Sequence, residues 1–186
     1  MNVREAIEKR RAYRSLEHVE ITEGLVRDLA ECAGLSASCF NNQPWRFVFV
    51  YDREVLRRLQ NALSTGNEWA YYASMIIAVF SREDLDCIIK DRYFYLFDTG
   101  MATAFIILRA TELGLVAHPI AGFSPKKAKE ILGIPQEMKL IALVVVGRHC
   151  REIRDTLSEK QVEAEKERPR RLRFGEFTFM NRYEEE

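Results

Sequence analysis

One long apolar segment, residues 91–113, constrains the fold more than any other feature of the sequence. Its apolar side chains run nearly all the way round a helix, and Gly114 ends the pattern. The small residues Gly100, Ala102 and Ala104 would let another helix approach closely. A chain of 186 residues is expected to form one domain, which is too small to cover such a helix on every side. We therefore expect part of the cover to come from a second subunit.

Three shorter apolar runs predict β-strands at residues 46–51, 75–80 and 140–147. The 75–80 run is apolar on both sides, which is typical of a central strand. Helices around a small sheet of four or five strands are the expected layout. Capping residues and apolar spacing place further helices at residues 2–11, 22–33, 52–63 and 124–133.

The character of the chain changes after Gly147. Residues 151–173 are densely charged and lack an apolar period that could carry a core, and Phe174, Phe177 and Phe179 follow. An aromatic, alternating segment of this kind suits an extended arm that pairs outside its own core. We expect one domain over residues 1–186, with about 151–186 as an arm that reaches a partner subunit.

Charge and cysteine content exclude several classes of protein. The 28 Lys and Arg balance 28 Asp and Glu, which removes the general electrostatic argument for binding nucleic acid or an anionic membrane. The longest uncharged apolar stretch within a helical segment, residues 99–108, is shorter than the roughly 20 residues of a membrane span. The N-terminus is too charged for a signal peptide. The four cysteines, widely spaced, indicate a reduced, cytoplasmic protein: Cys32, Cys39, Cys87 and Cys150.

Self-sufficient catalytic motifs are missing from the sequence. It has no phosphate-binding glycine loop, no His-Glu-x-x-His and no Gly-x-Ser-x-Gly. The histidines His18, His118 and His149 are scattered, and the adjacent His149 and Cys150 suit buried packing better than metal ligation, so no metal site is expected. Many aromatic residues without a catalytic group suggest that a cofactor performs the chemistry.

Two basic clusters lie at opposite ends of the chain. If the fold brings them together, their guanidinium groups would form a phosphate site, because arginine binds phosphate through paired hydrogen bonds. The alternative is a solvated basic face. The clusters contain Lys9, Arg10, Arg11 and Arg14 at one end, and Lys166, Arg168, Arg170, Arg171 and Arg173 at the other.

Two uncharged loops are further candidates for ligand binding. Residues 36–44 offer hydroxyl, thiol, amide and backbone donors, which suit a neutral heteroaromatic edge or a ribityl chain. Residues 119–123 form a turn in which Gly122 permits close approach of a ligand to the backbone. Each could equally be only a connection between elements.

Together, these segments resemble the FMN-dependent nitroreductase family over nearly the whole chain. Arg10-Arg11-Ala12-Tyr13-Arg14 is similar to its Arg-Arg-Ser-x-Arg motif, and residues 38–45 to its Ser-Ser-x-Asn-x-Gln-Pro-Trp loop. Further markers follow in the family's order: Asn67, residues 98–100, 112–115, 119–123 and 132–135, and the closing Asn181-Arg182-Tyr183.

The resemblance implies an α+β fold of three layers, with helices on both faces of a small, mostly antiparallel sheet. It also implies an intertwined homodimer with an exchanged C-terminal arm and one FMN at each end of the interface. The implied phosphate ligands are Arg10, Arg11, Arg14, Arg168 and Arg171, with Arg170 as an alternative. Ser38, Cys39, Asn41 and Gln43 would contact the flavin from the partner chain, Asn67 its ribityl or pyrimidine side, and Pro119, Ile120 and Gly122 its ring, with the Gly122 N–H near N5.

The activity implied by the resemblance is ping-pong transfer of two electrons from NADH or NADPH through FMN to a nitroaromatic or quinone, with no catalytic side chain required. A specialised FMN enzyme, such as a dehalogenase or a flavin-modifying enzyme, and a non-catalytic flavin or nucleotide binder are the alternatives. The sequence departs from the family's pattern at three positions. These departures weaken the expectation of nitroreductase activity more than the expectation of FMN binding. Ala12 replaces the motif's serine, Ala70 a lysine of some members, and Ala121 the glutamate of one subgroup.

Overall fold

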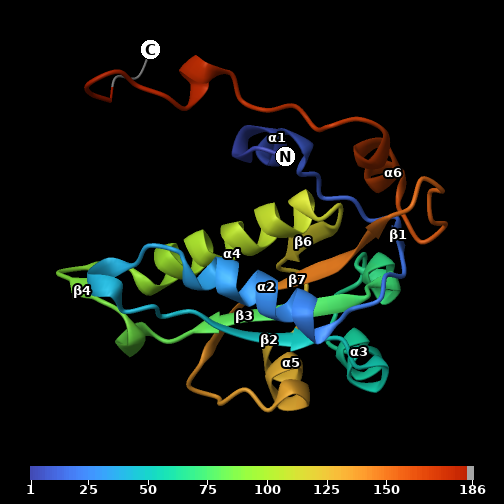
Figure 1. Cartoon of the computed structure of the whole chain (residues 1–186), viewed down its shortest axis with the longest axis horizontal. Helices are drawn as coiled ribbons and strands as arrows, with labels where there is room; N and C mark the ends of the chain where they lie inside the picture. The colour runs from blue at the N-terminus through green and yellow to red at the C-terminus, as the bar shows by residue number, and fades with distance from the viewer. Residues whose placement is uncertain (184–186) are drawn as a thin grey trace.

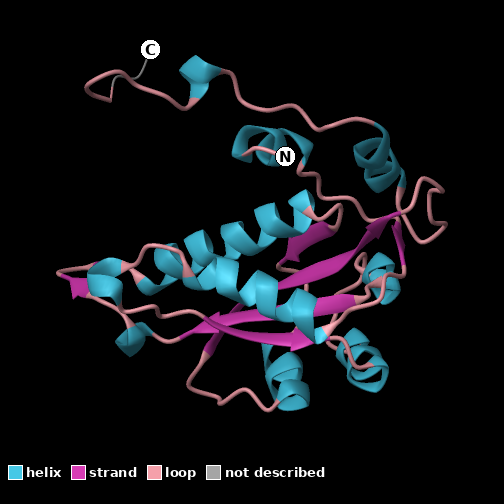
Figure 2. Ribbon diagram, viewed as in Figure 1, coloured by secondary structure: helices cyan, strands magenta, loops and turns pink. Residues whose placement is uncertain are grey.

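A sheet of five antiparallel strands lies between two layers of helices (Figures 1 and 2). The structure is a computed structural model, and it describes residues 1–183. Strand β7 (Lys139–His149) is the longest and pairs with three neighbours. The strand order is β1 (Leu16–Glu17), β7, β3 (Met75–Ser81) and β2 (Arg46–Val50), and β6 (Val116–Ile120) also pairs with β7.

The central strand β3 is buried along its whole length, as its composition predicts. Because successive side chains of a strand point to opposite faces, Ile76 and Ile77 lie in two separate cores. The Ile76 side is covered by helices α3 (Arg53–Gln60) and α5 (Pro125–Leu132), and the Ile77 side by α2 (Glu23–Gly34) and α4 (Tyr95–Glu112). This arrangement confirms the three-layer α+β fold.

Local capping explains where the helices begin and end. Asp52 accepts hydrogen bonds from the backbone N–H groups of Glu54 and Val55 at the start of α3. Ser124 caps α5, and Gly133 ends it with a φ of 65°, a conformation that favours glycine. The residues that predict these helix ends therefore act as caps.

Short elements complete the fold. They are helices α1 (Val3–Lys9) and α6 (Glu159–Lys166), the hairpin strands β4 (Ile88–Ile89) and β5 (Arg92–Tyr93), and the 3-10 turns η1 (Cys39–Asn41), η2 (Glu68–Tyr72), η3 (Glu83–Leu85) and η4 (Phe174–Glu176). The hairpin turns at Lys90, which has a φ of 60°, so α4 begins at Tyr95 instead of residue 91. Helix α6 lies in a region where the sequence predicts no helix.

Apolar side chains remain exposed on α4 and on the segment that follows α6. Phe97 and Phe105 of α4 are 64% and 42% exposed. Residues 167–183 run from α6 back over α1 and away from the rest of the molecule, with Phe174 and Phe177 exposed (Figure 1). Cover of these surfaces by a second subunit remains a prediction. No helix within residues 1–183 is long and apolar enough to cross a membrane.

Candidate functional site

The two basic clusters of the sequence meet at the C-terminal end of α1. Burial lowers the pKa of Arg10, and the positive charges of Arg168, Arg171 and Arg11 lower it further. Within residues 1–183, none of these four arginines forms an ion pair with a carboxylate. The fold therefore concentrates positive charge that the protein does not neutralise, and a bound phosphate would neutralise it.

Hydrogen bonds hold the two clusters together. Arg11 Nη2 donates to the carbonyl of Ala164 at 2.8 Å, and Arg168 Nη2 donates to the carbonyl of Arg10 at 3.0 Å. Arg170 instead pairs with Glu176 at 3.0 Å, so its charge is already balanced. Of the C-terminal arginines, Arg168 and Arg171 are thus better placed than Arg170 to bind an anion near Arg10.

A buried carboxylate fixes the backbone beside this cluster. Glu165 of α6 is 7% exposed and accepts hydrogen bonds from the N–H groups of Arg14 at 2.6 Å and Ser15 at 3.2 Å. Burial lowers the pKa of Arg14, and the charge of Glu165 opposes that shift. The Arg14 guanidinium carbon lies 5.8 Å from the ring centroid of Trp69, so the segment that Glu165 holds also contacts η2.

A neutral histidine lies next to the arginines. His118 of β6 donates from Nδ1 to the carbonyl of Tyr13 at 3.1 Å, and its ring stacks on Trp69 with centroids 4.7 Å apart. Burial lowers the pKa of His118 to about 4; the bond to Tyr13 opposes the shift, and Arg14 and Arg10 add to it. His118 therefore packs against Trp69 as a neutral ring and adds no charge to the site at neutral pH.

Asn67 and Gly122 form a second part of the site. The Asn67 side chain donates from Nδ2 to the carbonyl of Gly122 at 2.9 Å and accepts from Trp69 Nε1 at 3.3 Å. A Cβ at residue 122 would lie 2.3 Å from Asn67 Nδ2, so any other residue there would displace the Asn67 amide from its present position. Within residues 1–183, the Gly122 N–H has no hydrogen-bond partner and is available to a ligand.

The residues before Gly122 divide between surface and core. Pro119 and Ala121 are exposed, whereas Ile120 is 8% exposed and its side chain lies in the core on the α3 and α5 side. Only the backbone of Ile120 could therefore meet a ligand. The exposed residues and Gly122 offer a small apolar platform beside the arginines.

The loop of residues 36–44 has an unusual backbone. Phe40, Asn41 and Gln43 have φ values of 48°, 59° and 49°, which are uncommon for residues with a side chain. The Ser38 hydroxyl accepts from the N–H of Gln43 at 3.0 Å, and Phe40 is 85% exposed. Backbone strain of this kind is frequent at functional sites, where the surrounding structure maintains it.

Cysteine pairing corrects the prediction that all four cysteines are reduced. Cys39 forms a disulfide with Cys87, 48 residues away in sequence, and Cys32 and Cys150 are free. The Cys39 N–H also donates to Asp98 of α4 at 2.6 Å, and burial raises the pKa of this aspartate. The fold brings Cys39 and Cys87 together because both the loop and the hairpin pack at the N-terminal end of α4.

The predicted site residues form two groups rather than one. Arg10, Arg14 and Asn67 lie with the β6 turn and α6, whereas Ser38 and Cys39 lie at the other end of the molecule, beside β4 (Figure 1). No hydrogen bond or ion pair joins the two groups within residues 1–183. A ligand that contacts both groups would therefore need the loop of another copy of the chain.

Several site residues escape prediction from the sequence. Glu165 and Trp69 carry no local signal, since their roles depend on contacts with Arg14 and His118. Asp98 could have been suspected, because a carboxylate within an apolar segment needs a partner when it is buried. Ala70 is buried in the core, so its side chain does not reach the site surface.

The fold and site together define a class of protein: a three-layer α+β domain with an unneutralised arginine cluster beside a glycine turn. Comparison with known proteins identifies the family. The model of the nitroreductase family matches residues 7–148, and the chain belongs to this family.

Individual relatives agree with this assignment. A protein of Thermus thermophilus named NADH dehydrogenase is 27% identical over 178 residues, covering 79% of this chain and 86% of that protein. The crystal structure of an oxidoreductase containing FMN superposes with a TM-score of 0.83 at 26% identity, covering 97% of this chain and 92% of the other. A nitroreductase family protein of Clostridium novyi gives a TM-score of 0.75 at 26% identity, covering 81% and 87%. The chain is thus a nitroreductase-family oxidoreductase.

Proposed function

We propose that this protein is an FMN-dependent enzyme that transfers two electrons from NADH or NADPH to an electron-poor acceptor, such as a nitroaromatic or a quinone, with ping-pong kinetics. The observation that carries the proposal is the unneutralised arginine cluster around Arg10. The FMN in one structural relative and the NADH in the name of another support it. Bound FMN would supply the hydride and electron chemistry that the side chains of the site lack.

The arginines would bind the FMN phosphate. Arg10 and Arg14 come from the segment between α1 and β1, and Arg168 and Arg171 from the segment after α6. Arg11 contributes charge, but its guanidinium already holds the carbonyl of Ala164. Burial lowers the pKa of Arg10 most, and repulsion from the other arginines lowers it further. A phosphate dianion would offset this repulsion, so binding and assembly of the cluster would support each other.

The glycine turn would orient the flavin ring. The free N–H of Gly122 would donate to N5, and Pro119 would pack against the ring. Asn67 would contact the ribityl or pyrimidine side while it holds the Gly122 carbonyl. A backbone donor at this position would fix the ring without supplying a competing acid.

A second copy of the chain would complete the site. Ser38, Cys39, Asn41 and Gln43 lie at the far end of the same chain, so they would contact the FMN held by the arginines of a partner. The exposed apolar side chains of α4 and of residues 167–183 would be buried in that homodimer. We therefore propose that residues 151–186 of this single domain include an arm that reaches the partner; residues 184–186 lie outside the described part of the chain.

The visible absorption spectrum of the freshly purified protein tests the proposal, followed by anaerobic addition of NADH and NADPH to separate samples. A yellow protein whose flavin absorbance bleaches with a nicotinamide would support the proposed function and identify the preferred donor. A yellow protein that neither nucleotide bleaches would instead support a specialised FMN enzyme. A colourless protein that takes up no added FMN would contradict both.

A further inference from the structure

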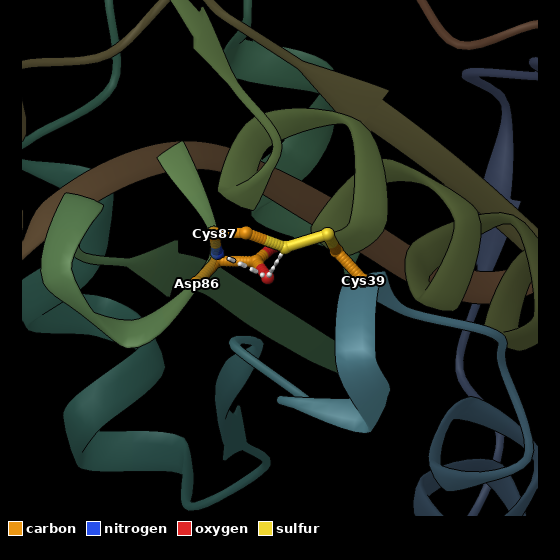
Figure 3. Close-up of side chains that lie close together, drawn as sticks. All are labelled: Cys39, Asp86 and Cys87. Carbon is orange, nitrogen blue, oxygen red and sulfur yellow. Dashed lines mark hydrogen bonds between the residues drawn. A yellow bond between two sulfur atoms is a disulfide. The ribbon is translucent and has the colours of Figure 1, made fainter. Parts of the chain in front are cut away.

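The disulfide lies in a small polar cluster, of which the proposed function uses only Cys39 and assigns no role to Cys87 or Asp86. Sulfur atoms of Cys39 and Cys87 and a carboxylate oxygen of Asp86 all lie within 4.8 Å of one another. Figure 3 shows the Asp86 carboxylate pointing toward the two sulfurs. All three residues are partly exposed, so an ion could reach them from solvent.

The two oxygens of the Asp86 carboxylate differ in their hydrogen bonding. Oδ1 accepts hydrogen bonds from the Cys87 N–H at 2.8 Å and from Asn42 at 3.3 Å. Oδ2 is buried and has no hydrogen-bond partner. No lysine, arginine or histidine within residues 1–183 forms an ion pair with Asp86. Oδ1 lies 3.5 Å from Cys87 Sγ, and the side chain of Asp98 forms a hydrogen bond with that of Asp86, so two acidic groups meet beside the sulfurs.

We propose that Cys39, Cys87 and Asp86 form a redox-gated site for a thiophilic divalent cation such as Zn²⁺. In the oxidised form the sulfurs are joined and bind no metal. In the reduced form two thiolates and one carboxylate oxygen provide three ligands of a tetrahedral site, and water fills the fourth position. This proposal does not depend on the proposed function.

The backbone geometry suits both forms. The Cα atoms of Cys39 and Cys87 are 6.2 Å apart, within the range of disulfides. Two zinc-bound sulfurs lie about 3.8 Å apart, given Zn–S distances of about 2.3 Å and tetrahedral angles. Side-chain rotation at unchanged Cα positions can supply this separation. Asp98 holds the Cys39 backbone through its N–H, and Asn42 holds Asp86, so each ligand already has a supporting hydrogen bond.

Exchange between the forms requires a reductant of the dithiol class. Two thiol groups of the reductant give two electrons and two protons to the S–S bond, which becomes two cysteine thiols while the reductant becomes a disulfide. Zinc then replaces the two thiol protons, which are released to solvent. Metal binding would protect the cysteines from re-oxidation until the metal is removed.

Zinc stoichiometry in the full chain tests the site. Protein is reduced with a dithiol, desalted without oxygen, mixed with Zn²⁺, desalted again and analysed for bound metal. We expect one zinc per chain in the reduced protein and none in the oxidised protein. Cys87→Ser should lose stable binding, and Asp86→Asn should weaken the affinity by roughly tenfold or more. Cys32→Ser, which removes a free cysteine in α2, and Asp91→Asn, which removes an exposed carboxylate near the hairpin, should bind like the wild type.

Differential alkylation of the wild-type protein avoids any dependence on the folding of the variants. Zinc should protect Cys39 and Cys87 from alkylation in the reduced protein and leave the extent of Cys32 alkylation unchanged. The proposal is overturned if the reduced wild type binds no more zinc than Cys87→Ser, or if zinc protects neither Cys39 nor Cys87. Binding in Asp86→Asn that equals the wild type would remove Asp86 from the site and overturn the three-ligand assignment.

Discussion

At the scale of single residues, the molecule shows how burial changes what a charged group can do. Arg10 and His118 lie in one region, yet burial leaves Arg10 as a candidate anion ligand and keeps His118 neutral. The difference follows from the starting pKa values, because an arginine stays charged after a moderate shift whereas a histidine loses its charge.

Replacing Arg10 tests the phosphate assignment. Arg10→Ala should weaken FMN affinity by roughly ten- to hundredfold, since a hydrogen bond to a charged group contributes about 1.5–3 kcal/mol. Its folding stability should stay equal or rise, because the change relieves repulsion by Arg168, Arg171 and Arg11. FMN titration of the flavin-free protein and thermal unfolding measure both effects. Arg27→Ala, a surface change on α2, is the control; equal FMN affinity in the two variants would refute the assignment.

His118 gives the protein a defined pH dependence. Its pKa is about 4 in the folded protein, against 6.5 for an ordinary histidine, so the unfolded chain takes up the proton first as the pH falls. The contribution to stability is complete above pH 6.5 and declines toward pH 4, by at most roughly 3 kcal/mol.

Urea unfolding between pH 7 and pH 4 measures this effect. His118→Asn, which keeps a donor for the Tyr13 carbonyl, should lose less stability over that range than the wild type. His18→Asn, at an exposed histidine, should follow the wild-type curve. Identical pH profiles for wild type and His118→Asn would show that His118 is not a buried neutral group.

At the scale of elements, local signals explain which parts of the fold are predictable. Short local signals predict both the strand at 75–80 and the helix capped by Ser124. The strand is predicted by an apolar run, and the helix by a capping residue at each end. For the candidate site, the sequence draws attention to the arginines and Gly122, because these residues are unusual in their local context; their role in binding stays a prediction. The Cys39–Cys87 bond escapes prediction because it joins residues distant in sequence. Helix α6 does carry a local signal, the capping box of Ser158 and Gln161, but it lacks the apolar period on which the prediction relied.

Helix α6 depends on Glu165. The Glu165→Ala change would leave the buried N–H groups of Arg14 and Ser15 without acceptors, and each costs about 1–3 kcal/mol. We expect a clear drop in the urea midpoint and weaker FMN retention. Glu163→Ala, an exposed change in the same helix, should leave both nearly unchanged. Similar unfolding midpoints for the two variants would contradict the role of Glu165.

At the scale of the whole molecule, the segment after α1 is joined to α6 and to the residues just after it. Arg168 bonds to the carbonyl of Arg10, Arg11 bonds to that of Ala164, and β1 pairs with the end of β7 through Leu16 and His149. Phe174 and Phe177, beyond α6, are exposed and suit the surface of a partner.

Removal of the C-terminal segment tests its two proposed roles, which are FMN binding and contact with the partner subunit. Truncation after Glu165 should leave the three-layer core folded, weaken FMN retention and shift the protein from dimer toward monomer. Analytical ultracentrifugation over a range of concentrations and FMN content after gel filtration measure the two losses. A truncated protein that dimerises and retains FMN like the full chain would contradict both the arm and the assignment of Arg168 and Arg171.

The contact between residues 10–14 and residues 164–168 has a consequence for protein synthesis. A ribosome releases the first of these segments well before the second. The sheet also assembles late, because β1, β3 and β6 all pair with β7, which leaves the ribosome after them. The anion site therefore cannot exist on a nascent chain that lacks residue 168. Cofactor loading would follow the release of residue 168 rather than the folding of the segments before it.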